Sequence, residues 1–250
     1  MPLADRTTGD VAVWIAGSGA VTVLTGAGIS TDSGIPDFRG PSGVWTRDPE
    51  AAKLVTLDAY VSDPAVRRRA WQSRRDHPAW HATPNAAHRA LAALADAGRL
   101  RALITQNIDG LHQRAGSTDV IELHGTIHEV GCLSCDDRRP MREALDRVAA
   151  GEPDPACTLC GGILKSATIS FGQALDPSVL RRAVAAASEC DLFLAVGTSL
   201  TVQPAAGLVE IAQHSGARIV IVNAQPTPYD PLAAAVIRDP ISEALPALIP

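Results

Sequence analysis

The feature that most constrains the fold lies in residues 21–40, where a strand of buried type leads directly into a glycine-rich turn. Residues 21–24 are valine, threonine, valine and leucine, a composition typical of a short buried strand. The chain then continues through Gly26, Ala27 and Gly28. Glycines in such a turn permit positive φ angles and let a ligand approach the bare backbone amides.

A helix start after this turn completes the motif. Ser30 or Thr31 can cap a short helix whose dipole favours an anion, so strand, turn and helix together predict a phosphate or pyrophosphate cradle. Thr31 stands where a dinucleotide-binding fingerprint has its third glycine, so a plain tight turn stays an alternative. Asp37, Phe38 and Arg39 follow between glycines and prolines, and their polar and aromatic character favours a functional loop over a connector.

The remaining chain alternates between helical periodicity and short apolar strands, which predicts a parallel sheet covered on both faces by helices. We expect helices at residues 10–17, 64–75 (capped by Asp63), 84–97 (capped by Thr83), 177–188, 204–213 and 241–248. We expect further strands at residues 100–105, 120–123, 191–196 and 218–222. Residues 34–58 lack a periodic pattern and are expected to form a long loop.

Polar residues directly follow the last apolar residue of each of five predicted strands. They are Thr25, Gly26, Thr105, Gln106, Asn107, His124, Gly125, Gly197, Thr198, Ser199 and Asn223. In an open α/β sheet, ligands bind outside the carboxyl ends of the strands. The common position of these residues favours one nucleotide site over several independent turns.

The cysteines form two C-x-x-C pairs. Cys132 and Cys135 make the first pair, Cys157 and Cys160 make the second, and 21 residues separate the two pairs. This spacing is typical of a four-thiolate zinc site in a ribbon-like inserted module, and its filled ligand set predicts a structural metal. A redox dithiol, two disulfides and another metal such as iron are the alternatives. Cys190, just before a strand, is expected in the core.

Composition limits the partners and the compartment. At 250 residues the chain is long enough for one large domain or one domain with an insert, and 46% hydrophobic content is ordinary for a globular protein. A net charge of -5 argues against nucleic acid as the main partner. We find no apolar run of membrane-spanning length and no secretory signal, and therefore expect a cytoplasmic protein without membrane contact, in which metal ligands are favoured over disulfides.

Several motifs occur in order along the chain, namely GAGISTDSGIPDFRG, TQNIDGLH, ELHGT, the paired C-x-x-C motifs, GTSL and VNAQPTPYD. Together they resemble the sirtuin family of NAD-dependent protein lysine deacylases, from about residue 14 to residue 248. The resemblance implies a Rossmann-like large domain with a small inserted zinc-ribbon domain, in one catalytic unit spanning residues 1–250. The large domain would comprise residues 10–34, 84–128 and 170–250, and the small domain a helical and loop insert, 35–83, with the zinc-ribbon insert, 129–169.

By matching position, the resemblance also implies a set of residues that hold NAD, which the family consumes as a co-substrate. These would be Gly26, Ala27, Gly28, Ser30, Asp37, Phe38, Arg39, Gln106, Asn107, Ile108, Asp109, Gly197, Thr198, Ser199, Asn223 and Ile241. Residues 106–109 would line the ribose and nicotinamide pocket, residues 197–199 and Asn223 would hold the adenosine half, and Ile241 would pack beside the adenine. One structural Zn²⁺ would be bound by Cys132, Cys135, Cys157 and Cys160.

The implied catalytic residues are His124 and Asn107. An imidazole titrates near neutral pH, so His124 can take a proton from a ribose hydroxyl. In the family's mechanism the acyl oxygen attacks the ribose carbon that nicotinamide leaves, and the activated hydroxyl then takes up the acyl carbon, giving free lysine and O-acetyl-ADP-ribose. The alternative for His124 is a strand-end histidine bonded to backbone. His88 and His112 are expected to pack against or cap helices.

A peptide substrate is implied to add as a strand between two segments of the chain. The candidates are Ile169, Ser170, Phe171 and Gly172 on one side and residues 200–202, including Val202, on the other. The chain departs from the family pattern at Ser166 and Gln173, where many relatives carry proline and glutamate. That departure bears on peptide preference and leaves the catalytic motif intact.

A second departure concerns the acyl group. Relatives that remove succinyl or malonyl groups pair a tyrosine with an arginine three residues later, and the matching positions here are Trp71 and Arg74. A surface arginine in an arginine-rich helix is the alternative for Arg74. We therefore expect deacetylation as the main activity and acidic deacylation as a secondary one at most.

Two rival functions stay open on the sequence. Mono-ADP-ribosyl transfer uses the same cleavage of NAD with another acceptor. A nucleic-acid-binding zinc ribbon would use Arg138, Arg139, Arg142 and Arg147, but acidic residues interleave with these cations and weaken their field. Acyl-lysine proteins are thus the expected partners, direct nucleic-acid binding is not expected, and the chain is expected to be a monomer.

Overall fold

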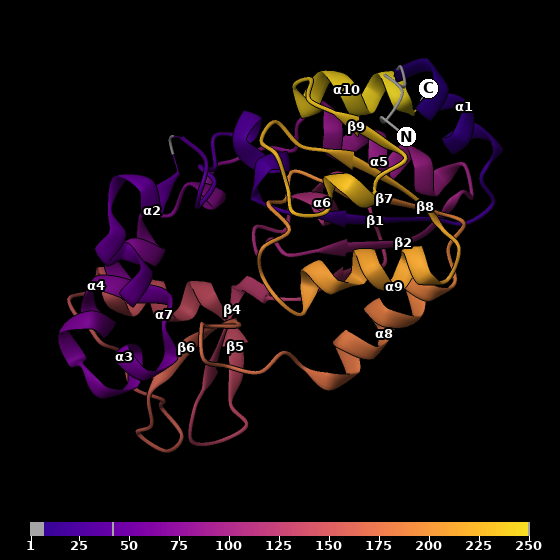
Figure 1. Ribbon diagram of the computed structural model, residues 1–250. Coiled ribbons are helices and arrows are strands. Elements are labelled where there is room, and N and C mark those ends of the chain that lie inside the picture. Colours follow the sequence, from indigo (N-terminus) through magenta and orange to yellow (C-terminus); the bar gives the residue numbers. More distant parts are fainter. Residues whose placement is uncertain (1–7, 42, 250) are drawn as a thin grey trace.

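The computed structural model of the protein describes residues 8–41 and 43–249, and it is built around two separate sheets (Figure 1). The larger sheet has six strands in the order β3-β2-β1-β7-β8-β9, and the smaller one has three strands in the order β5-β4-β6. These two sheets match the predicted fold class, a Rossmann-like α/β unit with a small insert.

All neighbouring strands of the large sheet pair in parallel. The strands are β1 (Val21–Thr25), β2 (Leu100–Thr105), β3 (Val120–Glu122), β7 (Leu192–Val196), β8 (Arg218–Val222) and β9 (Ala235–Ile237). Every residue of β1 and β7 is buried, as expected of central parallel strands that are covered on both faces. The short edge strand β9 was not predicted.

Helices cover both faces of this sheet (Figure 1). Helices α1 (Thr8–Gly17), α5 (Ala86–Asp96) and α10 (Ile241–Leu248) pack on one face, and α8 (Pro177–Ser188) and α9 (Leu208–His214) pack on the other. Successive residues of β1 therefore enter different cores: Val23 packs with α1, α5 and α10, whereas Leu24 packs with α8 and α9. In the described ranges, no helix has both the length and the apolar character needed to cross a bilayer.

The small sheet is antiparallel and carries its own core. Its strands are β4 (Gly125–Cys132), β5 (Arg138–Pro140) and β6 (Leu164–Thr168), and helices α4 (Pro64–Arg75) and α7 (Met141–Ala149) pack on it. Trp71 of α4 is fully buried in this core, among Val130, Met141 and Leu164. Asp63 caps α4 as predicted, because its Oδ1 accepts a hydrogen bond from the N–H of Ala65 at 2.7 Å.

The long loop predicted at residues 34–58 is only partly irregular. It contains α2 (Val44–Arg47), the 3₁₀ helix η2 (Pro49–Val55) and the start of α3 (Leu57–Ser62). The insert between the cysteine pairs likewise contains α7, which was not predicted. Helices as short as α2 and α3, with 4 and 6 residues, span too few turns to produce the apolar period that reveals longer ones.

Two predicted helix caps were wrong. The helix after Thr83 begins at Ala86, and its cap is Asn85, whose Oδ1 accepts from the N–H groups of Ala87 and His88 at 3.0 and 3.3 Å. His88 Nδ1 accepts from the N–H of Asn85 in return, which completes a capping box.

Neither Ser30 nor Thr31 is a cap either. The 3₁₀ helix η1 (Ala27–Ser33) starts directly after Gly26, so both residues lie inside it. Thr31 Oγ1 donates to the carbonyl of Gly28, and Ser30 is buried beneath the turn. The remaining short elements are α6 (Leu111–Arg114), η3 (Pro78–Trp80), η4 (Ala205–Gly207) and η5 (Asp230–Leu232).

The glycines of the first turn are required by the neighbouring strand end. A Cβ atom on Gly28 would lie 2.8 Å from Gly197 Cα and 2.9 Å from Gly197 O, and a Cβ on Gly26 would lie 2.8 Å from the same carbonyl oxygen. Gly197 itself has a φ of +61°, in the left-handed region that favours glycine. The turns after β1 and β7 therefore touch backbone to backbone, and this contact excludes side chains independently of any ligand.

We predict that Gly28→Ala lowers the free energy of unfolding by about 1–3 kcal/mol, because the added methyl group overlaps backbone that cannot rotate away. Gly17→Ala is the control, since its added Cβ meets nothing within 4 Å. Urea denaturation of both variants measures the difference. Equal stability of the two variants would contradict the proposed contact.

Candidate functional site

The predicted polar strand ends lie side by side at the carboxyl edge of the large sheet. The ladder of backbone hydrogen bonds continues past the strands, from Gly26 N to Val196 O at 3.0 Å and from Gln106 N to Thr25 O at 3.0 Å. It extends in the same way from Gly197 N to Val222 O, from Asn223 N to Ile237 O and from Leu123 N to Thr105 O. The predicted convergence of these strand ends at one rim is therefore confirmed.

Asn107 is held at this rim by three hydrogen bonds. Its Nδ2 donates to Gly26 O at 3.2 Å and to Ser30 Oγ at 3.1 Å, and its backbone N–H donates to Thr105 Oγ1 at 3.0 Å. Ser30 Oγ in turn donates to Asp109 Oδ2 at 2.8 Å. Ser30 and Asp109 are only 1% and 4% exposed, so both lie beneath the rim and support Asn107 from below.

A second set of buried hydrogen bonds lies below the first, and no sequence pattern predicted it as a unit. Thr25 Oγ1 donates to Thr105 Oγ1 at 2.8 Å and lies 2.9 Å from His112 Nε2. His112 is packed on α6, as expected of it. Thr25 ends β1 and Thr105 ends the adjacent strand β2. Their matching positions at the ends of two strands could have indicated this contact.

His124 lies beside Asn107 with a defined tautomer. Its Nδ1 is 2.9 Å from the carbonyl oxygen of Gln106, and a carbonyl only accepts, so Nδ1 carries the proton. Nε2 is thereby left with its lone pair and can act as a base. Partial burial lowers the pKa of His124 below its usual value of 6.5, against the opposing effect of the Gln106 hydrogen bond. The imidazole is therefore neutral at pH 7.

The side chain of Gln106 also links the end of β2 to the end of β7. Its Nε2 donates to Thr198 Oγ1 at 2.9 Å. Further along the rim, Ser199 Oγ is 2.9 Å from Thr201 Oγ1, and Asn223 Nδ2 donates to Gln225 O at 2.8 Å.

Ile241 and Ile108 were also predicted to contact NAD. Ile241 begins α10 and packs, half-buried, against the core beneath that helix, and the next residue, Ser242, hydrogen-bonds Asp32 of η1. Ile108 accepts a backbone hydrogen bond from Ile127 N at 3.0 Å.

The loop after η1 packs on itself and against Phe171. Asp37 Oδ1 accepts from Gly40 N at 3.0 Å, which shapes the turn. Phe38 stacks on Trp45 with ring centroids 4.8 Å apart, and the Arg39 guanidinium lies 4.5 Å above the same indole. The ring centroids of Trp45 and Phe171 are 5.4 Å apart, so the loop contacts the predicted peptide-binding segment.

The predicted peptide-binding segment, residues 169–172, is held by backbone hydrogen bonds. Ile169 N donates to His124 O at 2.8 Å, and Phe171 pairs with both Val55 O and Leu57 N, at 2.8 and 2.9 Å. The backbone groups of Phe171 are therefore already used, whereas its side chain is 43% exposed. Gly172 follows in the left-handed region with a φ of +85°. In the other predicted segment, the carbonyl of Val202 accepts from Ala206 N at 2.9 Å.

Trp71 and Arg74 lie against the small sheet. The indole of Trp71 belongs to the core described above, and Arg74 Nε donates to Ser166 Oγ at 3.1 Å. The guanidinium of Arg74 lies 5.0 Å from the ring centroid of Tyr60, and its Nη1 is shielded from solvent without a hydrogen-bond partner. Burial lowers the pKa of Arg74.

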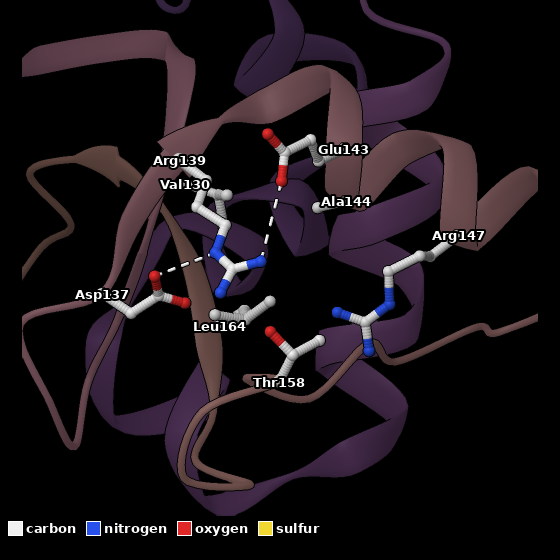
Figure 2. Close-up of a pocket in the computed structure, with 8 residues that line it drawn as sticks. All are labelled: Val130, Asp137, Arg139, Glu143, Ala144, Arg147, Thr158 and Leu164. Carbon is white, nitrogen blue, oxygen red and sulfur yellow. Dashed lines mark hydrogen bonds and ion pairs between the residues drawn. The ribbon is translucent and has the colours of Figure 1, made fainter.

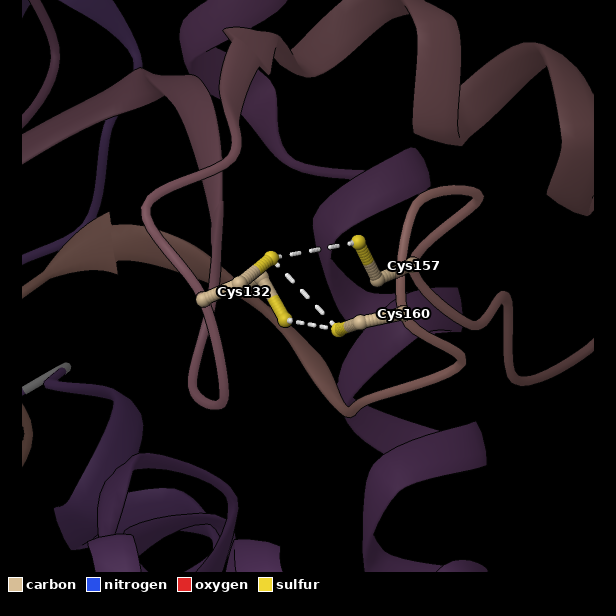
Figure 3. Close-up of side chains that lie close together, drawn as sticks. Cys132, Cys157 and Cys160 are labelled. Atoms are coloured by element: carbon tan, nitrogen blue, oxygen red, sulfur yellow. Dashed lines mark hydrogen bonds between the residues drawn. The ribbon is translucent and has the colours of Figure 1, made fainter.

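The four cysteines of the C-x-x-C pairs form one cluster (Figure 3). The Sγ atoms of Cys132 and Cys160 are 3.5 Å apart, those of Cys135 and Cys157 are 3.8 Å apart, and those of Cys135 and Cys160 are 3.4 Å apart. Four thiolates placed tetrahedrally at 2.3 Å from Zn²⁺ would be about 3.8 Å apart, whereas a disulfide needs about 2.05 Å. The cluster therefore fits zinc, and all four thiols are free. Cys190 is separate and buried, as predicted.

The arginines near the cysteines are neutralised locally. Arg139 lies between Asp137 and Glu143, at 2.9 and 3.8 Å, beside a cavity of about 40 Å³ (Figure 2). The other three predicted cations pair likewise, in the ion pairs Arg138–Glu129, Arg142–Asp146 and Arg147–Glu152.

Comparisons with known proteins agree with this geometry. Residues 26–204 match the model of the Sir2 family. A Streptomyces coelicolor protein named NAD-dependent protein deacetylase 2 is 57% identical over 235 residues, covering 93% of this chain and 98% of its own. Among solved structures, a Sir2 histidine-to-alanine variant with deacetylated p53 peptide and 3′-O-acetyl ADP-ribose is similar with a TM-score of 0.90, at 35% identity and 97% coverage of both chains. A Sir2 complex with p53 peptide and NAD⁺ has a TM-score of 0.86, at 36% identity and 96% coverage of both chains.

We predict that Cys157→Ser abolishes stoichiometric zinc binding and lowers the melting temperature by about 10 °C, because a structural zinc contributes several kcal/mol to folding. Metal analysis of purified protein and thermal unfolding measure the two effects. Cys190→Ala, which removes a thiol outside the cluster, keeps one zinc per chain. Full zinc content in the Cys157→Ser variant would overturn the assignment.

Proposed function

The chain belongs to the Sir2 family, and from this membership we propose that it is an NAD-dependent protein lysine deacetylase. The reaction transfers the acetyl group of acetyl-lysine to ADP-ribose and releases nicotinamide. The observation that carries the proposal is His124, whose lone pair on Nε2 is fixed by the Gln106 carbonyl beside the amide of Asn107. The related structures with a p53 peptide and with NAD⁺ or acetyl ADP-ribose support it.

The rim residues are proposed to hold NAD in two halves. The glycine turn at Gly26 and Gly28 and the start of η1 would lie against the pyrophosphate, and Asn107 would reach the ribose and nicotinamide end. Thr198, Ser199 and Asn223 lie further along the rim, on the side proposed for adenosine. Phe38 and Arg39 cover the site from the loop that Trp45 anchors.

His124 is proposed as the general base. With Nδ1 donating to Gln106, Nε2 takes the proton from a ribose hydroxyl, and that hydroxyl then receives the acyl carbon. The lowered pKa of His124 keeps Nε2 unprotonated at neutral pH. Ser30 and Asp109 act below, where they fix the orientation of Asn107.

The division into a large and a small domain at the predicted boundaries is also a proposal. The four cysteines are proposed to bind one structural Zn²⁺ that holds the small sheet and α7 together. Free thiols agree with a cytoplasmic location.

Acyl-lysine proteins are the proposed partners of a monomeric enzyme. The ion pairs of Arg138, Arg139, Arg142 and Arg147 argue against a nucleic-acid-binding ribbon.

A second candidate activity, removal of acidic acyl groups, is favoured by one observation. Arg74 has an unpartnered Nη1, and Lys165, 3% exposed, has its pKa lowered to about 8 by burial and by the charge of Arg74. Within the described ranges neither cation forms an ion pair with a carboxylate. A carboxylate on an acyl group would complement them.

Other contacts keep this second activity minor. The Tyr60 hydroxyl is the phenol nearest to Arg74, and it already donates to Leu164 O at 2.7 Å. Trp71 supplies no hydroxyl. Deacetylation thus stays the main proposed activity.

We predict that His124→Ala lowers NAD-dependent deacetylation of an acetyl-lysine peptide at least about a hundredfold, because the general base is lost. In the wild type, the acid limb of the pH profile of kcat/KM falls with a midpoint below 6.5, since protonation of His124 removes the lone pair. Mass spectrometry of labelled NAD products distinguishes O-acetyl-ADP-ribose from label retained on protein. Label on protein without acetyl-ADP-ribose would support ADP-ribosyl transfer instead.

We predict that acetyl peptide turns over faster than succinyl peptide, and that Arg74→Ala lowers the succinyl rate more than the acetyl rate. The physical reason is loss of the cation opposite the acyl carboxylate. Arg75→Ala, a change at the exposed neighbour that pairs with Asp76, is the matched control. A dominant succinyl rate in the wild type would refute the assigned preference.

A further inference from the structure

A continuous chain of hydrogen bonds links a buried histidine to the backbone of Asn107. It runs from His112 Nε2 to Thr25 Oγ1 at 2.9 Å, from there to Thr105 Oγ1 at 2.8 Å, and ends at the N–H of Asn107 at 3.0 Å. Each residue is at most 2% exposed except Asn107, which lies at the rim. The chain therefore crosses β1 and β2 from the protein interior to the proposed nicotinamide end.

The donors of these hydrogen bonds converge on Thr105 from both sides. The Asn107 N–H donates to Thr105 Oγ1, which also accepts from the Thr25 hydroxyl. Since Thr25 uses its only proton on Thr105, its oxygen accepts from His112, whose proton is then on Nε2. His112 thus holds the rotamer of Thr25, and Thr25 holds that of Thr105.

His112 does little else with its imidazole. Its Nδ1 is shielded from solvent and has no hydrogen-bond partner, and its ring packs 4.9 Å from that of His88. Burial, and secondarily His88, lowers the pKa of His112 to about 3, so the ring is neutral at pH 7. A phenylalanine would fill such a packing position at a smaller desolvation penalty, because it leaves no polar nitrogen unpaired. Among residues 8–41 and 43–249, the one contact that needs an imidazole is the contact with Thr25.

We propose that His112 is a positioning residue for the deacetylation reaction, acting through Thr25 and Thr105 on the backbone of Asn107. The inference rests on the proposed function, in which Asn107 reaches the reacting end of NAD. The backbone of Asn107 is fixed by this chain, and its side chain is fixed separately by Ser30 and the Gly26 carbonyl. Loss of these hydrogen bonds frees the backbone of Asn107, while the partners of its side chain remain.

The test compares His112→Gln with His112→Asn. The glutamine amide reaches the position of Nε2 and can donate to Thr25, whereas the asparagine amide reaches only the position of Nδ1. We expect kcat for an acetyl peptide to fall about tenfold or more in His112→Asn and to recover substantially in His112→Gln. The dissociation constant for ADP-ribose, measured by calorimetry, stays within about twofold in both variants.

A second pair of variants distinguishes the loss of this hydrogen-bond chain from the general effect of removing a buried hydroxyl. Thr25→Val removes the link, and Thr22→Val makes the same change three residues earlier on β1, where Thr22 Oγ1 donates instead to Ala186 O at 2.9 Å. Both threonines are fully buried, so both variants lose stability to a similar extent in thermal unfolding. We expect only Thr25→Val to lose kcat beyond what its stability change explains.

Two results would overturn the positioning role: equal kcat in His112→Gln and His112→Asn, or equal kcat in Thr25→Val and Thr22→Val. A wild-type protein without NAD-dependent deacetylation would refute the proposed function instead. The two failures are therefore distinguishable within one set of assays.

Discussion

The backbone contact between the turns that follow β1 and β7 is the constraint on which the rest of the site depends. Gly28 N donates to Gly197 O at 2.8 Å, and no side chain fits at Gly26 or Gly28 against that neighbour. This close approach brings the carboxyl ends of the central strands to one level. It places the start of η1 directly at the ends of these strands, where a helix start favours an anion.

Burial beneath the rim keeps the two histidines there uncharged. His88 and His112 are neutral, with burial lowering their pKa values to about 4 and about 3. Both would take up a proton near pH 6.5 in the unfolded chain, so acidification below that value favours unfolding, and stability declines as the pH falls from 6.5 towards 4. The same environment strengthens each hydrogen bond that holds Asn107 in place.

Much of this arrangement could be predicted because parallel strands have simple rules. Apolar runs such as Val21 to Leu24 located the strands, and the rule that ligands bind at carboxyl ends placed Asn107 and His124 at one rim. The spacing of the cysteines predicted their cluster, since two C-x-x-C pairs need only a turn each to converge. Other features depend on contacts between distant segments. The role of Thr25 follows from its partner on β2, and the cap at Asn85 from the side chain of His88, so neither is visible in a local pattern.

A crystal structure of the protein with NAD tests the central claim most directly, namely that one dinucleotide spans the carboxyl rim of the large sheet. The account predicts density with the pyrophosphate at Gly26 and Gly28 and the nicotinamide ribose between Asn107 and His124 Nε2. A different region of the molecule offers the contrast, a cleft of about 440 Å³ lined by Glu122, Lys165 and Arg182, among other residues. Density for NAD in that cleft, with the rim empty, would contradict the account.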